Sequence, residues 1–152
     1  MRITRSRLPV FLGLLGTLPF IAAAAMVWLP LPGEWTIGTP RLLRAIAGYS
    51  AVVLSFLAGI QWGLALSINE DAPTSARNLF LLSVASSLMA WGLLFIDAAG
   101  TRLLCTIALF CLVWLIDGLL RLQKLIPHWF FRLRSAATGV AITSLLLLFA
   151  RT

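Results

Sequence analysis

The sequence predicts an all-α membrane protein, a bundle of five transmembrane helices that forms a single domain over residues 1–152. Three observations predict it. Hydrophobic residues make up 61% of the chain and charged residues only 11%, whereas soluble domains are about half apolar and a quarter charged. The apolar residues gather in five long runs, and short polar or basic segments separate the runs. A soluble fold of this size could not bury so much apolar surface, but a bilayer removes that need.

Each apolar run is expected to form one spanning helix, because a span requires about 20 predominantly apolar residues. The first four runs reach this length. The fifth, Ala136–Ala150, reaches it only if its helix starts soon after Pro127. Pro19, in the middle of the first run, lacks a backbone donor and predicts a kink there. The predicted helices cover about 8–29, 40–68, 79–96, 103–120 and 131–150.

The basic residues predict how the chain is oriented. The formal net charge is +7, but the cations lie between apolar runs, which favours contact with lipid headgroups and not with nucleic acid. A cytoplasmic N-terminus and an outside C-terminus put eight Lys and Arg residues inside and four outside, as the positive-inside rule favours. The inside set is Arg2, Arg5, Arg7, Arg77, Arg121, Lys124, Arg132 and Arg134, and the outside set is Arg41, Arg44, Arg102 and Arg151.

The first run has two other interpretations. Its basic start, apolar stretch and Ala23–Ala25 resemble a signal peptide, and cleavage there would leave four helices. The apolar run continues through Met26–Leu29 at spanning length, which favours a retained helix. The basic start also resembles a mitochondrial transit peptide, but it lacks the length and the Ser-rich amphipathic character of one.

Small residues recur every four positions along the second predicted helix. Such a stripe lets another helix backbone approach closely, so that van der Waals contact replaces the missing hydrophobic driving force. The sequence therefore predicts a helix-packing face, whose partner is another helix of this chain, the same helix of a second copy or another membrane protein. The stripe consists of Ala47, Ala51, Ser55, Gly59, Gly63 and Ser67.

A few polar residues inside the predicted spans are candidates for a functional site. Gln61 lies on the side of its helix away from the stripe, and an amide facing lipid is costly, so the second helix is expected to be central. Asp117 has two interpretations: an i, i+4 pair with Arg121 that reaches the membrane interface, or an intramembrane functional acid. A polar cluster in the cytoplasmic half, which lines a vestibule or holds helices together, would comprise Gln61, Asp117, Ser83, Ser86, Ser87 and Thr138.

The segment before the fifth run is predicted to lie at the membrane interface through His128, Trp129, Arg132 and Arg134. His128 has no carboxylate or thiol at ligand spacing, so no metal site is predicted. Cys105 and Cys111 point in different directions on a helix and are expected to be small apolar fillers. No cofactor is predicted, and enzyme sequence motifs are absent, so the sequence predicts a protein that is not an enzyme.

Several segments carry a family resemblance. They are Leu12-Gly13, Gly16 and Pro19-Phe20; Tyr49-Ser50-Ala51, Ser55-Phe56, Gly59 and Trp62-Gly63; and Pro127, Trp129 and Leu133-Arg134. Together they resemble domain-of-unknown-function family 3429, the transmembrane protein 69-like family. The resemblance implies a small multi-helix protein of the bacterial inner (plasma) membrane or, as the alternative, of the mitochondrial inner membrane. It implies no known activity, and it favours retention of the first helix.

Three functions are consistent with these features. The first is a non-enzymatic membrane protein that packs against itself or a partner through the second helix. The alternative is a small transporter or channel, proton-linked, that uses Asp117 and Gln61. An embedded enzyme is the least favoured, because no catalytic constellation is present.

Overall fold

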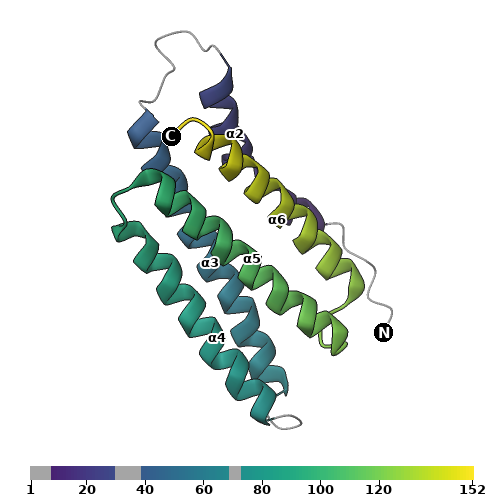
Figure 1. Ribbon diagram of the computed structural model, residues 1–152. Helices are drawn as coiled ribbons and strands as arrows, with labels where there is room; N and C mark the ends of the chain where they lie inside the picture. The colour runs from purple at the N-terminus through teal and green to yellow at the C-terminus, as the bar shows by residue number, and fades with distance from the viewer. Residues whose placement is uncertain (1–7, 30–38, 69–72) are drawn as a thin grey trace.

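The computed structural model describes residues 8–29, 39–68 and 73–152, and these residues hold helices and turns only. Figure 1 shows a bundle of long helices that run roughly along one axis. Five stretches are long and apolar enough to cross a membrane, which confirms the predicted fold class. The elements are α1 (Leu8–Leu15), α2 (Leu18–Trp28), α3 (Thr39–Ile68), α4 (Pro73–Gly92), the 3₁₀ turn η2 (Leu93–Phe95), α5 (Ala99–Leu122) and α6 (His128–Phe149).

Three helices begin earlier than the apolar runs predict. The third span begins at Pro73 and not at residue 79, the fourth at Ala99 and not at 103, and the fifth at His128 and not at 131. In α4 and α5 the first turn contains polar or small residues, which a count of apolar residues omits, whereas α6 begins directly after Pro127. Helical geometry needs only satisfied backbone groups, and polar first turns meet water or headgroups at the end of a span.

The first span is broken, as Pro19 predicts. Gly16 and Thr17 separate α1 from α2, and Pro19 lies in the first turn of α2. The break frees backbone carbonyls, which need donors inside a membrane. Thr17 donates its hydroxyl to the Leu14 carbonyl at 2.7 Å, and the Tyr49 hydroxyl of α3 donates to the Gly16 carbonyl at 2.8 Å. A hydrogen bond from the neighbouring helix α3 thus satisfies a carbonyl at the break.

The helix α3, which was predicted to be central, contacts α2, α4, α5 and η2. The helix α6 packs against α1, α2 and α5. The first and last spans run parallel, because Gly13 lies beside Leu133 at one end of the bundle and the Trp28 indole donates to the Leu147 carbonyl at the other. Leu8 and the C-terminal Thr152 therefore lie at opposite ends of the bundle.

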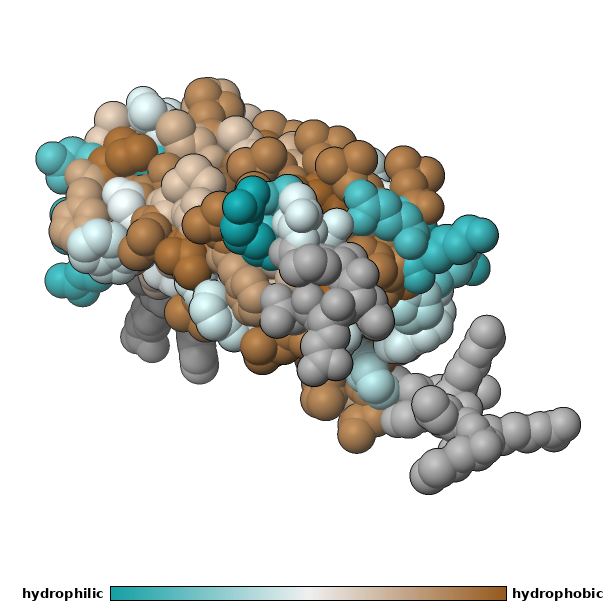
Figure 2. Space-filling view, turned by 90° about the horizontal axis from the view of Figure 1, so that it is seen from below, coloured by the Kyte–Doolittle hydropathy of each residue, from teal (hydrophilic) through white to brown (hydrophobic). Residues whose placement is uncertain are grey.

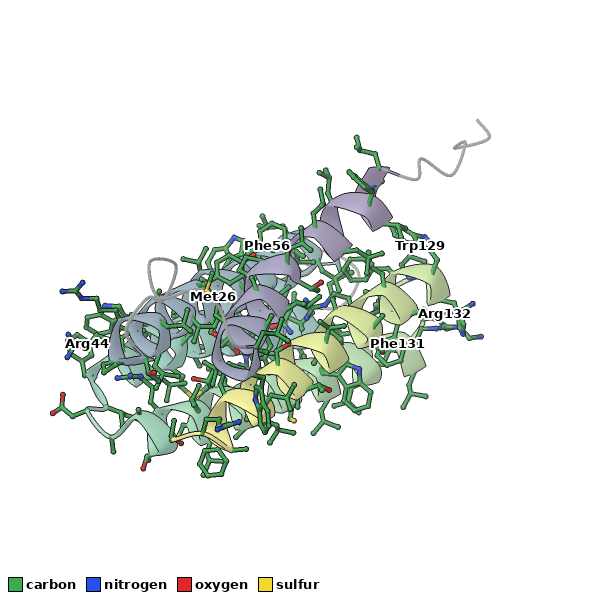
Figure 3. All side chains as sticks on the ribbon, turned by 90° about the horizontal axis from the view of Figure 1, so that it is seen from above. Met26, Arg44, Phe56, Trp129, Phe131 and Arg132 are labelled. Atoms are coloured by element: carbon green, nitrogen blue, oxygen red, sulfur yellow. The ribbon has the colours of Figure 1, made fainter. Side chains whose placement is uncertain are left out.

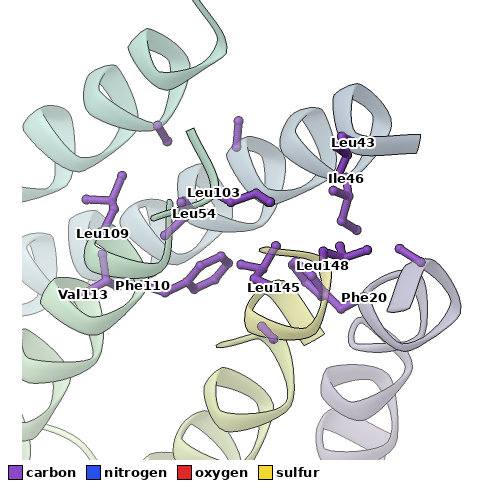
Figure 4. Packing of buried hydrophobic residues seen from close by; sticks show 14 of the residues in the cluster. Phe20, Leu43, Ile46, Leu54, Leu103, Leu109, Phe110, Val113, Leu145 and Leu148 are labelled. Atoms are coloured by element: carbon purple, nitrogen blue, oxygen red, sulfur yellow. The ribbon is translucent and has the colours of Figure 1, made fainter. Parts of the chain in front are cut away.

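The interior consists of two apolar clusters. The larger joins residues of α2, α3, α4, α5 and α6 (Figure 4). Phe20 is 1% exposed, and the centroid of its ring lies 5.3 Å from that of Tyr49 and 5.9 Å from that of Phe110. The smaller cluster lies toward the other end and consists of Ala65, Leu79, Ile116, Leu120 and Ile126. Edge-to-face aromatic packing and interlocking aliphatic side chains hold the helices together where lipid gives no hydrophobic drive.

The outer surface is apolar along the sides of the bundle. Hydrophobic residues cover most of the face seen in Figure 2, and large side chains such as Phe56, Leu66 and Leu122 are more than 60% exposed. A soluble monomer rarely exposes apolar patches of this extent. Figure 3 shows Arg44 and Arg132 at opposite ends of the molecule, on either side of the apolar stretch. This pattern fits a bundle surrounded by lipid.

Candidate functional site

The most distinctive polar feature is a buried ion pair between α5 and α6. Arg134 donates from Nε at 3.0 Å and from Nη2 at 2.7 Å, and both bonds go to Oδ2 of Asp117. The two residues are 8% and 5% exposed. Within the ranges that the structure describes, this is the sole salt bridge. Asp117 and Arg134 each lie several residues from the nearby helix end, so the pair lies inside the span.

The predicted pairing is wrong: Asp117 pairs with Arg134 and not with Arg121. Arg134, which was predicted to lie at the membrane interface, is buried against α5. The reason is the antiparallel α5–α6 hairpin, which sets residue 117 opposite residue 134. A second side-chain hydrogen bond joins the two helices close to this pair, where the Trp114 indole donates to the Ser135 hydroxyl at 2.9 Å. A buried carboxylate needs a partner within the protein, and the guanidinium is well suited to charge-assisted hydrogen bonding.

Gln61 is buried at the same level of the bundle. On α3, Gln61 lies between Leu57 of the larger cluster and Ala65 of the smaller cluster. On α5, the change from the larger to the smaller cluster falls between Val113 and Ile116, beside Asp117. The side chain is 2% exposed, and neither its amide nitrogen nor its oxygen has a hydrogen-bond partner. Gln61 and Asp117 therefore occupy one polar layer between two apolar clusters, but no hydrogen bond joins them.

The predicted serines and threonine are divided between roles. The Ser83 hydroxyl donates to the Ala58 carbonyl of α3 at 2.7 Å and holds α4 against α3. Ser86 and Thr138 are buried, whereas Ser87 is half-buried. Five of the predicted polar residues are therefore buried in the bundle, namely Gln61, Ser83, Ser86, Asp117 and Thr138. The hydroxyl of Ser83 joins two helices.

The small-residue stripe of α3 is covered at one end and open at the other. Ala47 and Ala51 are buried, but Ser55, Gly59, Gly63 and Ser67 are exposed. A Cβ added at Gly59 or Gly63 would meet no heavy atom of another group within 4 Å. No described helix of this chain packs on that half, so the intramolecular interpretation of Gly59 and Gly63 is wrong. The helix α4 packs on another side of α3, at Ala58.

The start of α6 exposes His128, Trp129 and Arg132, at the end of the bundle where interfacial residues were predicted (Figure 3). Trp129 is 42% exposed. Among the described residues, no group of three or more His, Cys, Asp or Glu side chains could hold a metal ion. Cys105 and Cys111 are free and half-buried in α5.

Sequence reasoning missed two contacts at the opposite end. Arg102 is 8% exposed and donates from Nη1 to the Ile96 carbonyl at 2.8 Å, while its Nε has no partner. The guanidinium of Arg151 lies 4.2 Å from the ring centroid of Trp28, a cation–π arrangement. Both contacts depend on how the helix ends meet, and a positive-inside count treats the two arginines as free cations.

A bundle of five apolar spans with a buried polar layer defines a multi-pass α-helical integral membrane protein. The chain belongs to the family described as "Protein of unknown function (DUF3429)", which matches residues 6–150. It is 34% identical over 137 residues to "Transmembrane protein 69" of Xenopus tropicalis. That alignment covers 90% of this chain and 51% of the relative, so the chain spans about half the length of that protein. No solved structure matches the chain.

Proposed function

We propose that this membrane protein is non-enzymatic and acts by assembly within the bilayer. The open face of α3, defined by Ser55, Gly59, Gly63 and Ser67, receives the same face of a second copy of the chain. One observation carries this proposal. Gly59 and Gly63 are exposed, and an added Cβ at either would find open space within 4 Å.

The physical argument rests on how helices associate in lipid. Close backbone approach and hydroxyl hydrogen bonds drive association there, since lipid tails are as apolar as leucine. The inner side of α3 is already occupied by contacts of Leu54, Ala58 and Gln61, each 2% exposed or less. Two copies related by a twofold axis bring identical open faces together, so one stripe is sufficient for a self-complementary interface.

Gly63→Leu tests the proposed interface. A Cβ at this exposed position has open space within 4 Å, so the thermal stability of the monomer is expected to stay the same. The two α3 backbones would be held apart, and self-association is expected to weaken at least tenfold, about 1.4 kcal/mol. Energy transfer between labelled copies in detergent micelles, measured against the protein-to-detergent ratio, gives the dissociation constant.

Gly139→Leu is the matched control, because Gly139 is also exposed on a spanning helix and has open space around it. We expect this variant to associate like the parent. A parent protein that stays monomeric at every ratio would refute assembly with a second copy. An equal loss in both variants would show that the α3 face has no special part in it.

The Gln61 side chain favours a second candidate function, a small transporter or channel. Its unpartnered amide lies in the same layer as the Asp117–Arg134 pair. Polar groups without partners in a membrane interior mark pathways for ions or polar solutes in many membrane proteins. The Gln61→Met variant described in the Discussion separates this candidate from a purely structural role.

We propose the bacterial inner membrane as the location, with the mitochondrial inner membrane as the alternative, and a cytoplasmic N-terminus. Burial of Arg134 and Arg102 reduces the predicted counts of eight and four cations to seven inside and three outside, by one each. The inside count includes Arg2, Arg5 and Arg7, which lie outside the described residues. The excess continues to support this orientation.

The side on which the C-terminus lies can be measured directly. A cysteine introduced by Thr152→Cys, with Cys105 and Cys111 both changed to serine, is expected to react with a membrane-impermeant maleimide in intact spheroplasts. The end of the chain is exposed, so access is not limited by the fold. Labelling that requires lysis would reverse the proposed orientation.

A further inference from the structure

A cavity of about 590 Å³ lies between α1, α2, α3 and α6, with Phe110 of α5 at its base. We call it the lateral groove. Its volume lies within the range of about 300–1,000 Å³ that is typical of ligand sites. Apart from Arg134 and a few hydroxyl and backbone groups, apolar side chains line it. Its wall includes Gly13 of α1 and Gly16, which lies at the break between α1 and α2. It also includes Tyr49, whose hydroxyl donates to the Gly16 carbonyl.

The lateral groove opens sideways toward the surrounding lipid. Leu12, Val52 and Phe56 form part of its lining, and they are 55%, 66% and 68% exposed. Figure 3 shows Phe56 and Trp129, another lining residue, along one edge of the bundle. On α6 the lining runs from Trp129 to Ala141, a rise of about 18 Å. One leaflet contributes about half of the roughly 30 Å hydrocarbon core, so the groove is about as long as one leaflet is deep.

Two polar residues of the groove, Arg134 and Thr138, lie on one face of α6. Arg134 lines the groove, whereas its partner Asp117 does not. Nε and Nη2 of Arg134 both donate to Asp117, whereas Nη1 finds no acceptor among the residues that the structure describes and is not fully buried. Thr138, one turn further along α6, also lines the groove and is 6% exposed. The groove therefore meets the cation while the counter-ion lies behind it, toward α5.

We propose that the lateral groove binds an anionic acyl lipid from one leaflet. The anionic headgroup accepts a hydrogen bond from Nη1 of Arg134, and the acyl chain continues past Thr138, Val52 and Tyr49 toward the middle of the membrane. Arg134 lies six residues into α6, about 9 Å from the helix start, and a guanidinium on its long stem reaches toward the headgroups from such a depth. Phosphate and carboxylate headgroups share the required chemistry.

Native mass spectrometry of the purified protein in detergent tests this directly. The probes are phosphatidylglycerol and phosphatidylcholine with identical acyl chains, and oleate. We expect one phosphatidylglycerol per chain, bound at least tenfold more tightly than phosphatidylcholine. Displacement of that lipid by oleate would assign the site to anionic acyl amphiphiles in general, and resistance to oleate would assign it to phosphate headgroups.

Three variants locate the site. Ala137→Phe fills the groove and is expected to weaken phosphatidylglycerol binding at least tenfold, whereas Ala108→Phe, at an exposed position of α5 outside the groove, leaves it unchanged. Val52→Trp enlarges an exposed side chain at the rim of the groove, so it should also block lipid binding without disturbing the packing of the core. The double variant Asp117→Leu/Arg134→Met is expected to bind the two phospholipids equally. Equal binding of both lipids by the parent, or parent-like binding by Ala137→Phe and Val52→Trp, would overturn the proposal.

Discussion

Replacing Arg134 by methionine is expected to lower the free energy of unfolding by about 3–5 kcal/mol, the usual effect of removing one partner from a buried ion pair. The variant would leave the Asp117 carboxylate 5% exposed, without a cation, between two apolar clusters. Water cannot compensate for it at this depth. Titration with sodium dodecyl sulfate from mild detergent, followed by circular dichroism, measures the change.

Arg132→Met is the matched control, because Arg132 is exposed two residues away on the same helix. It is expected to change stability by less than about 0.5 kcal/mol. The double variant Asp117→Leu/Arg134→Met removes both charges, and apolar replacements for a buried pair are often neutral or stabilising, so it should recover most of the loss. If Arg134→Met were as stable as the parent, the ion pair would not contribute to stability, and the conclusion that it holds α5 against α6 would be wrong.

Gln61→Met is expected to raise the free energy of unfolding by about 1–3 kcal/mol, since an unsatisfied buried polar group costs that much. Methionine keeps the unbranched shape of the side chain and removes both unpartnered amide atoms. If Gln61 serves only packing, stability rises and nothing else changes. If the chain is a transporter, the same variant abolishes the flux that the parent shows in proteoliposomes. A parent without flux for protons, ions or small solutes would remove the transporter candidate.

Gln123→Met controls for the chemistry of the substitution, because Gln123 is exposed at the end of α5. Its expected effect on stability is within about 0.5 kcal/mol. A decrease in stability for Gln61→Met, beside an unchanged Gln123→Met, would show that the amide of Gln61 makes favourable contacts in the membrane. That result would contradict the interpretation of an unsatisfied group.

The fold could be predicted from the sequence because lipid simplifies the problem. A spanning segment must satisfy its own backbone, so an apolar run of sufficient length is a helix. Pro19 likewise acts locally, and the break beside it was predictable. The early starts at Pro73 and Ala99 were missed because polar and small residues at helix ends carry no apolar signal, whereas the fifth helix begins at His128, soon after Pro127, as its length required.

The candidate site was harder to predict because its contacts join distant parts of the chain. Asp117 suggested a partner four residues away, but the actual partner is 17 residues away across a helix hairpin. Nothing in the local sequence distinguishes buried Arg134 from exposed Arg132. The polar character of Gln61 was enough to place it inside, since lipid excludes an amide. Its lack of hydrogen-bond partners depends on the side chains of other helices.

The length of α3 has a consequence for the membrane around it. Its 30 residues extend about 45 Å, whereas the hydrocarbon core of a typical bilayer is about 30 Å thick. Tilting shortens the projection of a helix only modestly, so part of α3 must emerge from the hydrocarbon. Arg41 and Arg44 are exposed in its first two turns. This end of α3 therefore extends into the headgroup layer, with two arginines among the lipid phosphates. A change in bilayer thickness would first change how deeply these turns lie in the membrane.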